Sequence, residues 1–226
     1  MIAIMGALTE EVAGLLEHFP DAQKHEHPAF DIYHTQGHEQ TLLIAQCGVG
    51  KANAAALCQS LIEQGAKQVI FTGVAAALDP SLKVADIVIS TDAMYHDVDV
   101  SAMGLPKGQL YLEELCWSAD EALVQSAVGA ARATTSNKVV TGRIVSGDQF
   151  IADQAKIQGL HEDFQASCAE MEGAAVAQIC AKNAIPFVII RSISDGGDAS
   201  ASVDFLEFLP IAAQQSVGVV LGMLER

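Results

Sequence analysis

The stretch PFVIIRSISD at residues 186–195 sets the fold class. Its first part, FVII, shows no polar alternation, which is typical of a strand buried on both faces of a parallel sheet. Its second part places Arg191, Ser194 and Asp195 where the chain is expected to leave the sheet. Charged groups in such a position are costly unless they are paired or functional. The stretch therefore predicts a central strand and a candidate site, the simpler alternative being a salt bridge at a helix N-terminus.

Strand and helix patterns alternate outward from this stretch in both directions. The patterns predict a helix that begins at Thr9 as its N-cap, further helices over 52–64, 171–183 and 203–226, and strands over 1–6, 30–35, 41–47, 68–72, 85–95 and 139–145. This alternation predicts one α/β domain over residues 1–226, a three-layer α-β-α sandwich with a mixed, mostly parallel central sheet. Ligands of such sheets bind beyond the carboxyl ends of the strands, so the chemistry is expected there.

Composition excludes several classes of partner. The formal net charge of −16 repels phosphate backbones and anionic membranes, so we expect no nucleic-acid or membrane partner. No apolar run approaches the roughly 20 residues of a membrane span, and the N-terminus lacks a basic region, which favours a cytoplasmic protein. The odd count of five cysteines, without C-x-x-C, indicates reduced thiols.

Two motifs imitate known ligand sites without completing them. The stretch AQCGVGKA at 45–52 resembles a P-loop, but Ala45 replaces the first glycine and Ala52 replaces the hydroxyl that binds magnesium. Its glycines still allow close backbone approach to a ligand at a helix start, although a simple tight turn explains them too. His34 and His38 are four residues apart, but Gly37 lies between them in an expected hairpin. We therefore expect no metal site.

Carboxylates follow several of the expected strands. GALTEE at 6–11 places Glu11 in the first turn of a helix, where acids also complement the helix dipole. AEMEG at 169–173 places Glu170 and Glu172 two residues apart at an expected helix start, so one is expected to face the site and the other the surface. With Asp195, three strand ends deliver carboxylates toward one edge of the sheet, and SGDQFI at 146–151 adds the aromatic ring of Phe150.

Taken together, these stretches resemble the 5′-methylthioadenosine/S-adenosylhomocysteine nucleosidase family, within the nucleoside phosphorylase-like superfamily. The resemblance covers nearly the whole chain, in order and in spacing. The matching stretches are GALTEEV at 6–12, GVGK at 48–51, LKVADIVIS at 82–90, YHDVDV at 95–100, VSGDQFI at 145–151, EMEGAA at 170–175, PFVIIRSISD at 186–195 and DFLEFL at 204–209.

The resemblance implies roles for matching residues. Asp195 is similar to the general acid that protonates purine N7, Ser194 to the neighbour that orients it, and Glu11 to the carboxylate that activates water. Glu172 resembles the glutamate that holds the ribose hydroxyls, and Met171 the side chain beneath the sugar. No cofactor is implied.

The resemblance also implies a binding pocket and a homodimer. The remaining matches are Phe150 against adenine, Ile151 reading the adenine edge through its backbone, Arg191 near the water and ribose, and Val49, Met103 and Phe205 lining the 5′-alkylthio pocket. In the family the equivalent of Met103 comes from the partner subunit, so a homodimer binding an adenine thionucleoside is expected.

The chemistry fits these residue types. The departing purine must gain a proton and a water must attack the opposite face of the sugar, which is the two-carboxylate logic of glycoside hydrolysis. A third carboxylate on the ribose favours a cationic transition state. Asp195 needs a raised pKa to donate a proton near neutrality, whereas Glu11 must stay ionised. We therefore expect the two pKa values to be pushed apart.

One stretch departs from the family pattern. The chain reads TGVAAA at 72–77 where the family commonly reads TGSAGG. Val74 thus replaces a serine, Ala76 and Ala77 replace two glycines, and Val74 and Ala75 are still expected at the substrate. The lost hydroxyl and added methyl groups predict lower activity or a shifted substrate preference.

Three alternatives remain open at this stage. A purine nucleoside phosphorylase shares the fold but needs phosphate-binding cations, and Arg191 is the only arginine expected near the site. A related hydrolase would act on another adenine nucleoside, such as 6-amino-6-deoxyfutalosine, adenosine or 5′-deoxyadenosine. A nucleoside-binding protein with reduced catalysis would explain TGVAAA, but not the intact carboxylates Glu11, Glu172 and Asp195.

Overall fold

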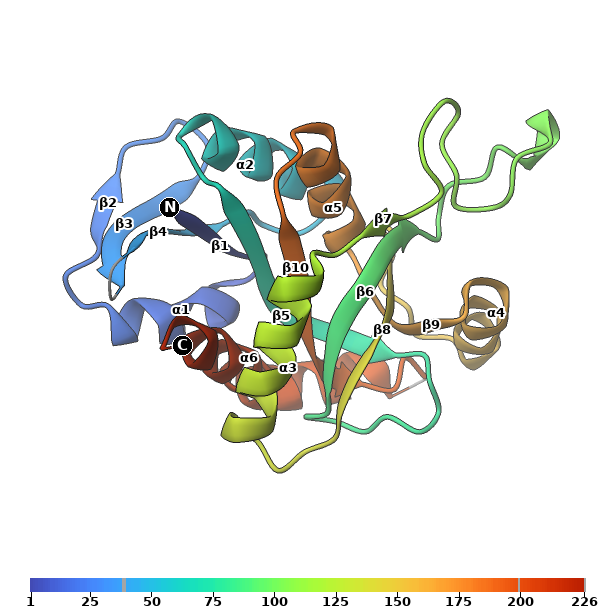
Figure 1. Cartoon of the computed structure of the whole chain (residues 1–226). Helices are drawn as coiled ribbons and strands as arrows, with labels where there is room; N and C mark the ends of the chain where they lie inside the picture. The colour runs from blue at the N-terminus through green and yellow to red at the C-terminus, as the bar shows by residue number, and fades with distance from the viewer. Residues whose placement is uncertain (38–39, 199, 226) are drawn as a thin grey trace.

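The computed structural model describes residues 1–37, 40–198 and 200–225. The expectations for His38 and for the last helical residue, Arg226, lie outside the described residues. The elements, shown in Figure 1, are β1 (Ile2–Gly6), α1 (Thr9–His18), β2 (Gln23–His25), β3 (Asp31–Gly37), β4 (Gln40–Gln46), α2 (Lys51–Glu63), β5 (Gln68–Ala77), β6 (Ile87–Tyr95), the 3-10 turn η1 (Ser101–Met103), β7 (Trp117–Ser118), α3 (Glu121–Thr134), β8 (Val139–Ser146), α4 (Gln154–Phe164), β9 (Ala166–Glu170), α5 (Gly173–Lys182), β10 (Phe187–Asp195) and α6 (Ala201–Leu224).

One mixed sheet runs through the molecule, as the sequence predicts. Its centre is parallel, because β4, β1, β5 and β10 lie side by side in the same direction, and β3 and β2 extend it antiparallel at one edge. On the other side β6, β8 and β9 follow, and β9 returns to β5 through Ala76 and Ala77. The sheet therefore closes on itself at the carboxyl end of β5, which a simple three-layer sandwich does not require.

Helices cover both faces of the sheet (Figure 1). One core lies between the sheet and helices α2 and α5, and a second core lies between the sheet and helices α1, α3 and α6. The single-domain α-β-α arrangement is thus confirmed. Helix α4 packs outside this arrangement against β9 in a smaller apolar cluster.

The central strand is longer than its apolar run. β10 continues from Phe187 to Asp195, and all nine of its residues are buried. The expectation that the chain leaves the sheet after Ser192 was therefore wrong. Strands on both sides supply backbone partners, so hydrogen bonding continues even where the side chains are polar. β5 likewise runs to Ala77, beyond the end that Gly73 predicted.

Two further expectations need correction. Thr9 is the first residue of α1 and not its N-cap, which is Leu8. The capping acceptor is the carboxylate of Glu11, which reaches back to the Leu8 N–H. The predicted helix at 171–183 begins at Gly173, because Glu170 ends strand β9 and Glu172 precedes the first helical turn. Helices α3 and α4 were not predicted.

Helix α6 is long and apolar enough to cross a membrane by length and composition alone, contrary to the sequence expectation. It carries Asp204, Glu207 and Pro210, and it packs against β10, β5, α3 and α1. Nine of its residues are buried there. Its apolar character therefore follows from its place in the core.

Candidate active site

A cavity of about 270 Å³ lies at the carboxyl ends of β1, β5, β9 and β10. It collects most of the residues that the sequence placed at strand ends. Its lining residues are Ala7, Leu8, Glu11, Val49, Val74, Ala75, Ala76, Gln149, Phe150, Ile151, Ala169, Glu170, Met171, Glu172, Ser194, Asp195 and Phe205.

Glu11 enters the cavity from the first turn of α1. Its Oε2 accepts hydrogen bonds from the backbone N–H groups of Ala7 (2.6 Å) and Leu8 (2.9 Å), and its Oε1 accepts one from Val74 (3.1 Å). The side chain is buried, so it is fixed in one orientation. These donors favour the ionised form that a base requires.

Asp195 ends β10 on the same cavity. Its Oδ2 accepts a hydrogen bond from Ser194 Oγ (2.8 Å) and its Oδ1 accepts one from the Gly197 N–H (2.9 Å). The Ser194 hydroxyl also lies 3.4 Å from the Ala75 carbonyl oxygen. Ser194 therefore holds the Asp195 carboxyl in place, as the sequence predicted for the orienting residue.

Burial raises the pKa of both carboxyls. For Glu11, Arg191 and the three backbone donors act against that rise, and for Asp195 Ser194 and Gly197 do so. The expectation that the two pKa values are pushed in opposite directions was therefore wrong, because both side chains leave water on folding. The difference lies in their neighbours, since Glu11 faces a guanidinium and Asp195 does not.

A buried ion pair lies behind the cavity. Arg191 Nη2 donates to Glu170 Oε2, and the guanidinium lies over the Phe71 ring, 4.2 Å from its centroid. Glu170 also accepts the Ser146 hydroxyl and the Gly173 N–H at the start of α5. The expectation that one glutamate of AEMEG faces the surface was wrong. Both are buried, because Glu170 neutralises Arg191 inside the sheet.

Glu172 faces the cavity from the start of α5. Its Oε1 accepts the Gly50 N–H at 2.7 Å, which ties α5 to the glycine turn before α2. Burial and the nearby carboxylate of Glu170 raise the pKa of Glu172 to about 8. Three carboxyls therefore surround one guanidinium, and this excess of acid favours a cationic ligand over an anionic one.

The guanidinium of Arg191 has spare donors. Its Nε and Nη1 are buried and have no hydrogen-bond partner among the described residues, although Nη1 lies next to Glu11 across Gly73. Buried donors of this kind ordinarily bind water or ligand. They mark the space between Glu11 and Arg191 as a place for a polar ligand atom.

Gly73 makes this arrangement possible. A Cβ at this position would overlap Arg191 Nη1 and would lie 2.8 Å from Cδ of Glu11. Only glycine allows both side chains to cross the strand there. The sequence analysis used Gly73 merely as a strand end, although an invariant need for close approach is a common reason for such a residue.

Replacing Gly73 is expected to displace the two side chains that meet above it. We expect Gly73→Ala to lower kcat/KM on the proposed nucleoside substrate about 10²-fold, because displacements near 1 Å in a site are expensive. Steady-state kinetics with thermal denaturation measure this. Gly159→Ala is the control, since a Cβ there meets nothing within 4 Å. Activity of Gly73→Ala within threefold of wild type would contradict the crossing geometry.

Apolar side chains line the mouth of the cavity. The rings of Phe150 and Phe205 meet edge to face with centroids 5.7 Å apart, and Val49 is exposed beside them. Ile151 and Met171 lie deeper in the lining, as predicted. These surfaces suit the face of a flat ring and an apolar tail.

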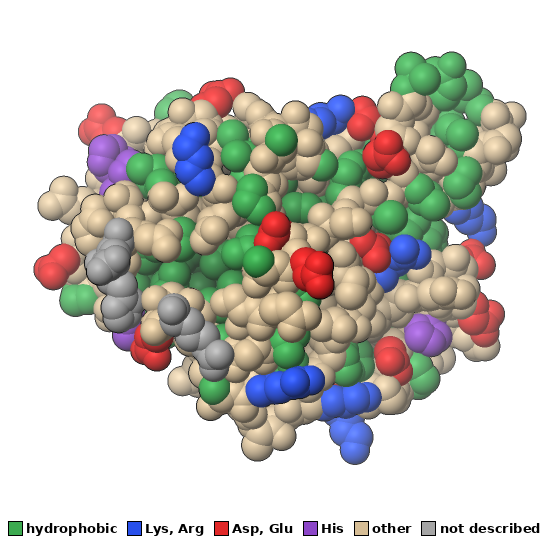
Figure 2. Space-filling view, viewed as in Figure 1, with side chains coloured by type: hydrophobic (Ala, Val, Ile, Leu, Met, Phe, Trp, Pro, Cys, Tyr) green, Lys and Arg blue, Asp and Glu red, His purple; other side chains and the backbone are tan. Residues whose placement is uncertain are grey.

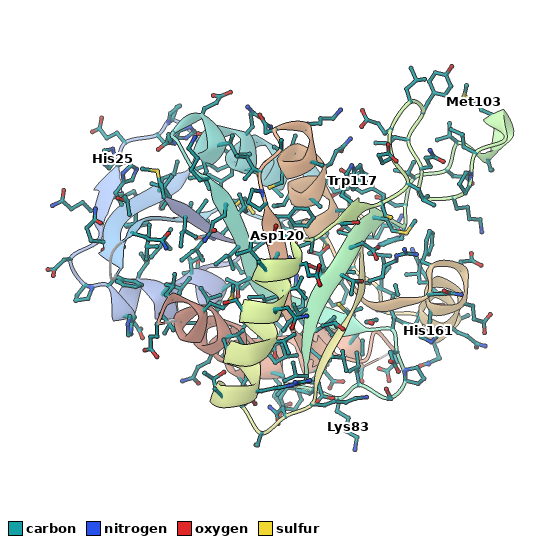
Figure 3. All side chains as sticks on the ribbon, viewed as in Figure 1. His25, Lys83, Met103, Trp117, Asp120 and His161 are labelled. Carbon is teal, nitrogen blue, oxygen red and sulfur yellow. The ribbon has the colours of Figure 1, made fainter. Side chains whose placement is uncertain are left out.

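Two predicted features lie elsewhere. Met103 lies on the arm between β6 and β7, 59% exposed and far from the cavity, as the labelled side chain in Figure 3 shows. Lys51 does not point at a ligand, because its Nζ lies 2.7 Å from Asp97 and 3.9 Å from Asp148. The P-loop reading therefore fails in space as it does in sequence.

Comparison with known proteins agrees with this arrangement. The model of the phosphorylase superfamily matches residues 1–225. The 5′-methylthioadenosine/S-adenosylhomocysteine nucleosidase of Actinobacillus succinogenes is 41% identical over 226 residues, which are 99% of this chain and 97% of that protein. The aminodeoxyfutalosine nucleosidase of Campylobacter jejuni is 37% identical over 226 residues, 100% of this chain and 98% of that protein.

A solved structure gives the same result. The 5′-methylthioadenosine/S-adenosylhomocysteine nucleosidase of Neisseria meningitidis, in complex with methylthio-immucillin-A, superposes with a TM-score of 0.96 at 36% identity, covering 99% of this chain and 98% of that one. The chain therefore belongs to the phosphorylase superfamily and, within it, to the family of 5′-methylthioadenosine/S-adenosylhomocysteine nucleosidases.

Proposed function

We propose that this protein hydrolyses the N-glycosidic bond of 5′-methylthioadenosine and S-adenosylhomocysteine, and also of 5′-deoxyadenosine, releasing adenine and the corresponding ribose. The observation that carries the proposal is one cavity holding two buried carboxyls, Glu11 and Asp195, each in its own hydrogen-bond environment. An acid and a base on one cavity are what hydrolysis of a glycosidic bond needs.

In this mechanism Asp195 donates a proton to purine N7 as the bond to the sugar breaks. Ser194 fixes the carboxyl through its hydroxyl, and burial keeps the proton available near neutral pH. Glu11 accepts a proton from the attacking water, which the unpartnered donors of Arg191 help to hold. Glu172 binds the ribose hydroxyls, and the excess of acid around Arg191 stabilises the cationic sugar.

The charge of the cavity favours water over phosphate as the nucleophile. Among the described residues that line it, none is lysine, arginine or histidine. Arg191 lies behind the lining and is paired with Glu170. A phosphate dianion between Glu11 and Glu172 would be repelled, so a phosphorylase is disfavoured.

The arm between β6 and β7 supports a homodimer within this proposal. Met103, Tyr111 and Leu112 are exposed on it, and Figure 2 shows apolar side chains gathered where the arm projects from the body. Such exposure is typical of a protein interface. We propose that Met103 completes the 5′ end of the partner's cavity in a cytoplasmic enzyme without a bound metal or cofactor.

Product analysis with and without phosphate tests the proposed function. Incubation with 5′-methylthioadenosine is expected to yield free adenine and methylthioribose at equal rates in both buffers. Methylthioribose 1-phosphate formed only with phosphate would make the protein a phosphorylase, and no product would favour a binding protein. Because one relative is an aminodeoxyfutalosine nucleosidase, that nucleoside and adenosine are tested in parallel.

A further inference from the structure

Val74 joins the reacting end of the cavity to its apolar end. It lies in β5, opposite Ser192 of β10, and its backbone N–H donates to Glu11 Oε1 at 3.1 Å. Its side chain is buried and contributes to the lining of the cavity. One residue therefore both holds the carboxylate of Glu11 and forms part of the wall beside it.

The side chain of Val74 faces helix α6. It belongs to an apolar cluster formed with Leu209, Ala212 and Ala213 of that helix, against which Leu8 and Phe205 pack. Phe205 lines the cavity as well, next to Val49. The wall on this side of the cavity, which we call the α6 wall, consists of Leu8, Val74 and Phe205.

The α6 wall offers no free donor to a ligand. None of its three side chains can form a hydrogen bond. The backbone N–H groups of Leu8 and Val74 could have served, but both already donate to Glu11, at 2.9 and 3.1 Å. A ligand hydroxyl pressed against this wall would therefore lose its water partners without gaining protein ones, which is unfavourable.

We propose that Val74 is a specificity-determining residue that selects nucleosides carrying an apolar 5′ substituent against those carrying a 5′-hydroxyl. The inference rests on the proposed function and names the feature of the substrate that the α6 wall tests. With the base against Asp195 and the ribose against Glu172, the 5′ carbon points toward Val49 and Phe205. A 5′-alkylthio group fits this apolar end, and a hydroxyl there remains unpaired.

The experiment compares 5′-methylthioadenosine with adenosine in three variants. Val74→Thr keeps the shape of valine and replaces one methyl group by a hydroxyl, Val74→Ser adds a hydroxyl in a smaller side chain, and Val74→Ala removes volume alone. We expect Val74→Thr and Val74→Ser to lower the ratio of kcat/KM for methylthioadenosine over adenosine about tenfold. Val74→Ala should leave this ratio within threefold of wild type.

The ratio separates specificity from a structural role. A variant that merely loosened α6 or moved Glu11 would slow both substrates together and leave the ratio unchanged. An unchanged ratio in Val74→Thr and Val74→Ser would overturn the proposal, as would an equal change in Val74→Ala. If the wild type cleaves neither nucleoside, the proposed function fails, and the same ratio is then taken from dissociation constants measured by calorimetry.

Discussion

Asp195→Asn is expected to lower kcat/KM about 10³-fold while the fold remains intact, because an amide cannot supply the proton that the purine needs. The amide fits the same contacts. Its oxygen accepts the Gly197 N–H, and its NH2 group donates to Ser194 Oγ, whose hydrogen turns to the Ala75 carbonyl oxygen 3.4 Å away. Single-turnover kinetics on 5′-methylthioadenosine measure the loss of chemistry separately from product release.

The same substitution should not destabilise the protein near neutral pH. Burial raises the pKa of Asp195 in the folded state, so its contribution to stability is present below its unfolded pKa and is lost as pH rises through the folded pKa. Asparagine removes that loss, and we expect an unchanged or higher Tm at pH 7. Wild-type kcat should also fall as pH rises through the folded pKa of Asp195.

A matched exposed carboxylate provides the control. Asp163 lies on the surface in an ion pair with Lys107, so Asp163→Asn should change neither kcat/KM nor Tm appreciably. Near-wild-type activity of Asp195→Asn would refute the assignment of the general acid. A large drop in its Tm would instead show that the amide does not fit the contacts described above.

Glu11→Gln is expected to lose activity on the same scale, about 10³-fold, and to lose stability as well. The base that activates water is gone. Moreover, Glu11 accepts three backbone N–H groups, and the amide nitrogen must face one of them, leaving a donor against a donor. Product formation and thermal denaturation, measured on one preparation, follow both losses.

Glu10→Gln is the control for this prediction, because Glu10 is the neighbouring acid in the first turn of α1 and is exposed. It should leave activity unchanged and alter Tm only slightly. Equal effects of the two substitutions would show that acid at the helix start acts through the dipole alone. Full activity of Glu11→Gln would remove Glu11 from the water-activating role.

The positions of the acids were largely predictable, because strand ends meet at one edge of a parallel sheet. Glu11, Glu172 and Asp195 each follow a strand and reach one cavity together with Phe150. Their contacts were not predictable in the same way. Glu170 was expected to share exposure with Glu172, since spacing along one chain reveals relative direction but not what fills the space in that direction.

The sequence by itself determined the α/β class, the central strand at 187–195 and which strand ends carry carboxyl groups. These follow from apolar runs and turn residues, which act locally. Only the tertiary structure decided that Arg191 pairs with Glu170, that Glu11 crosses β5 above Gly73, and that Val74 faces α6. Those contacts join residues far apart in the chain. They arise from the register between β5 and β10 and from helix packing, neither of which a local pattern encodes.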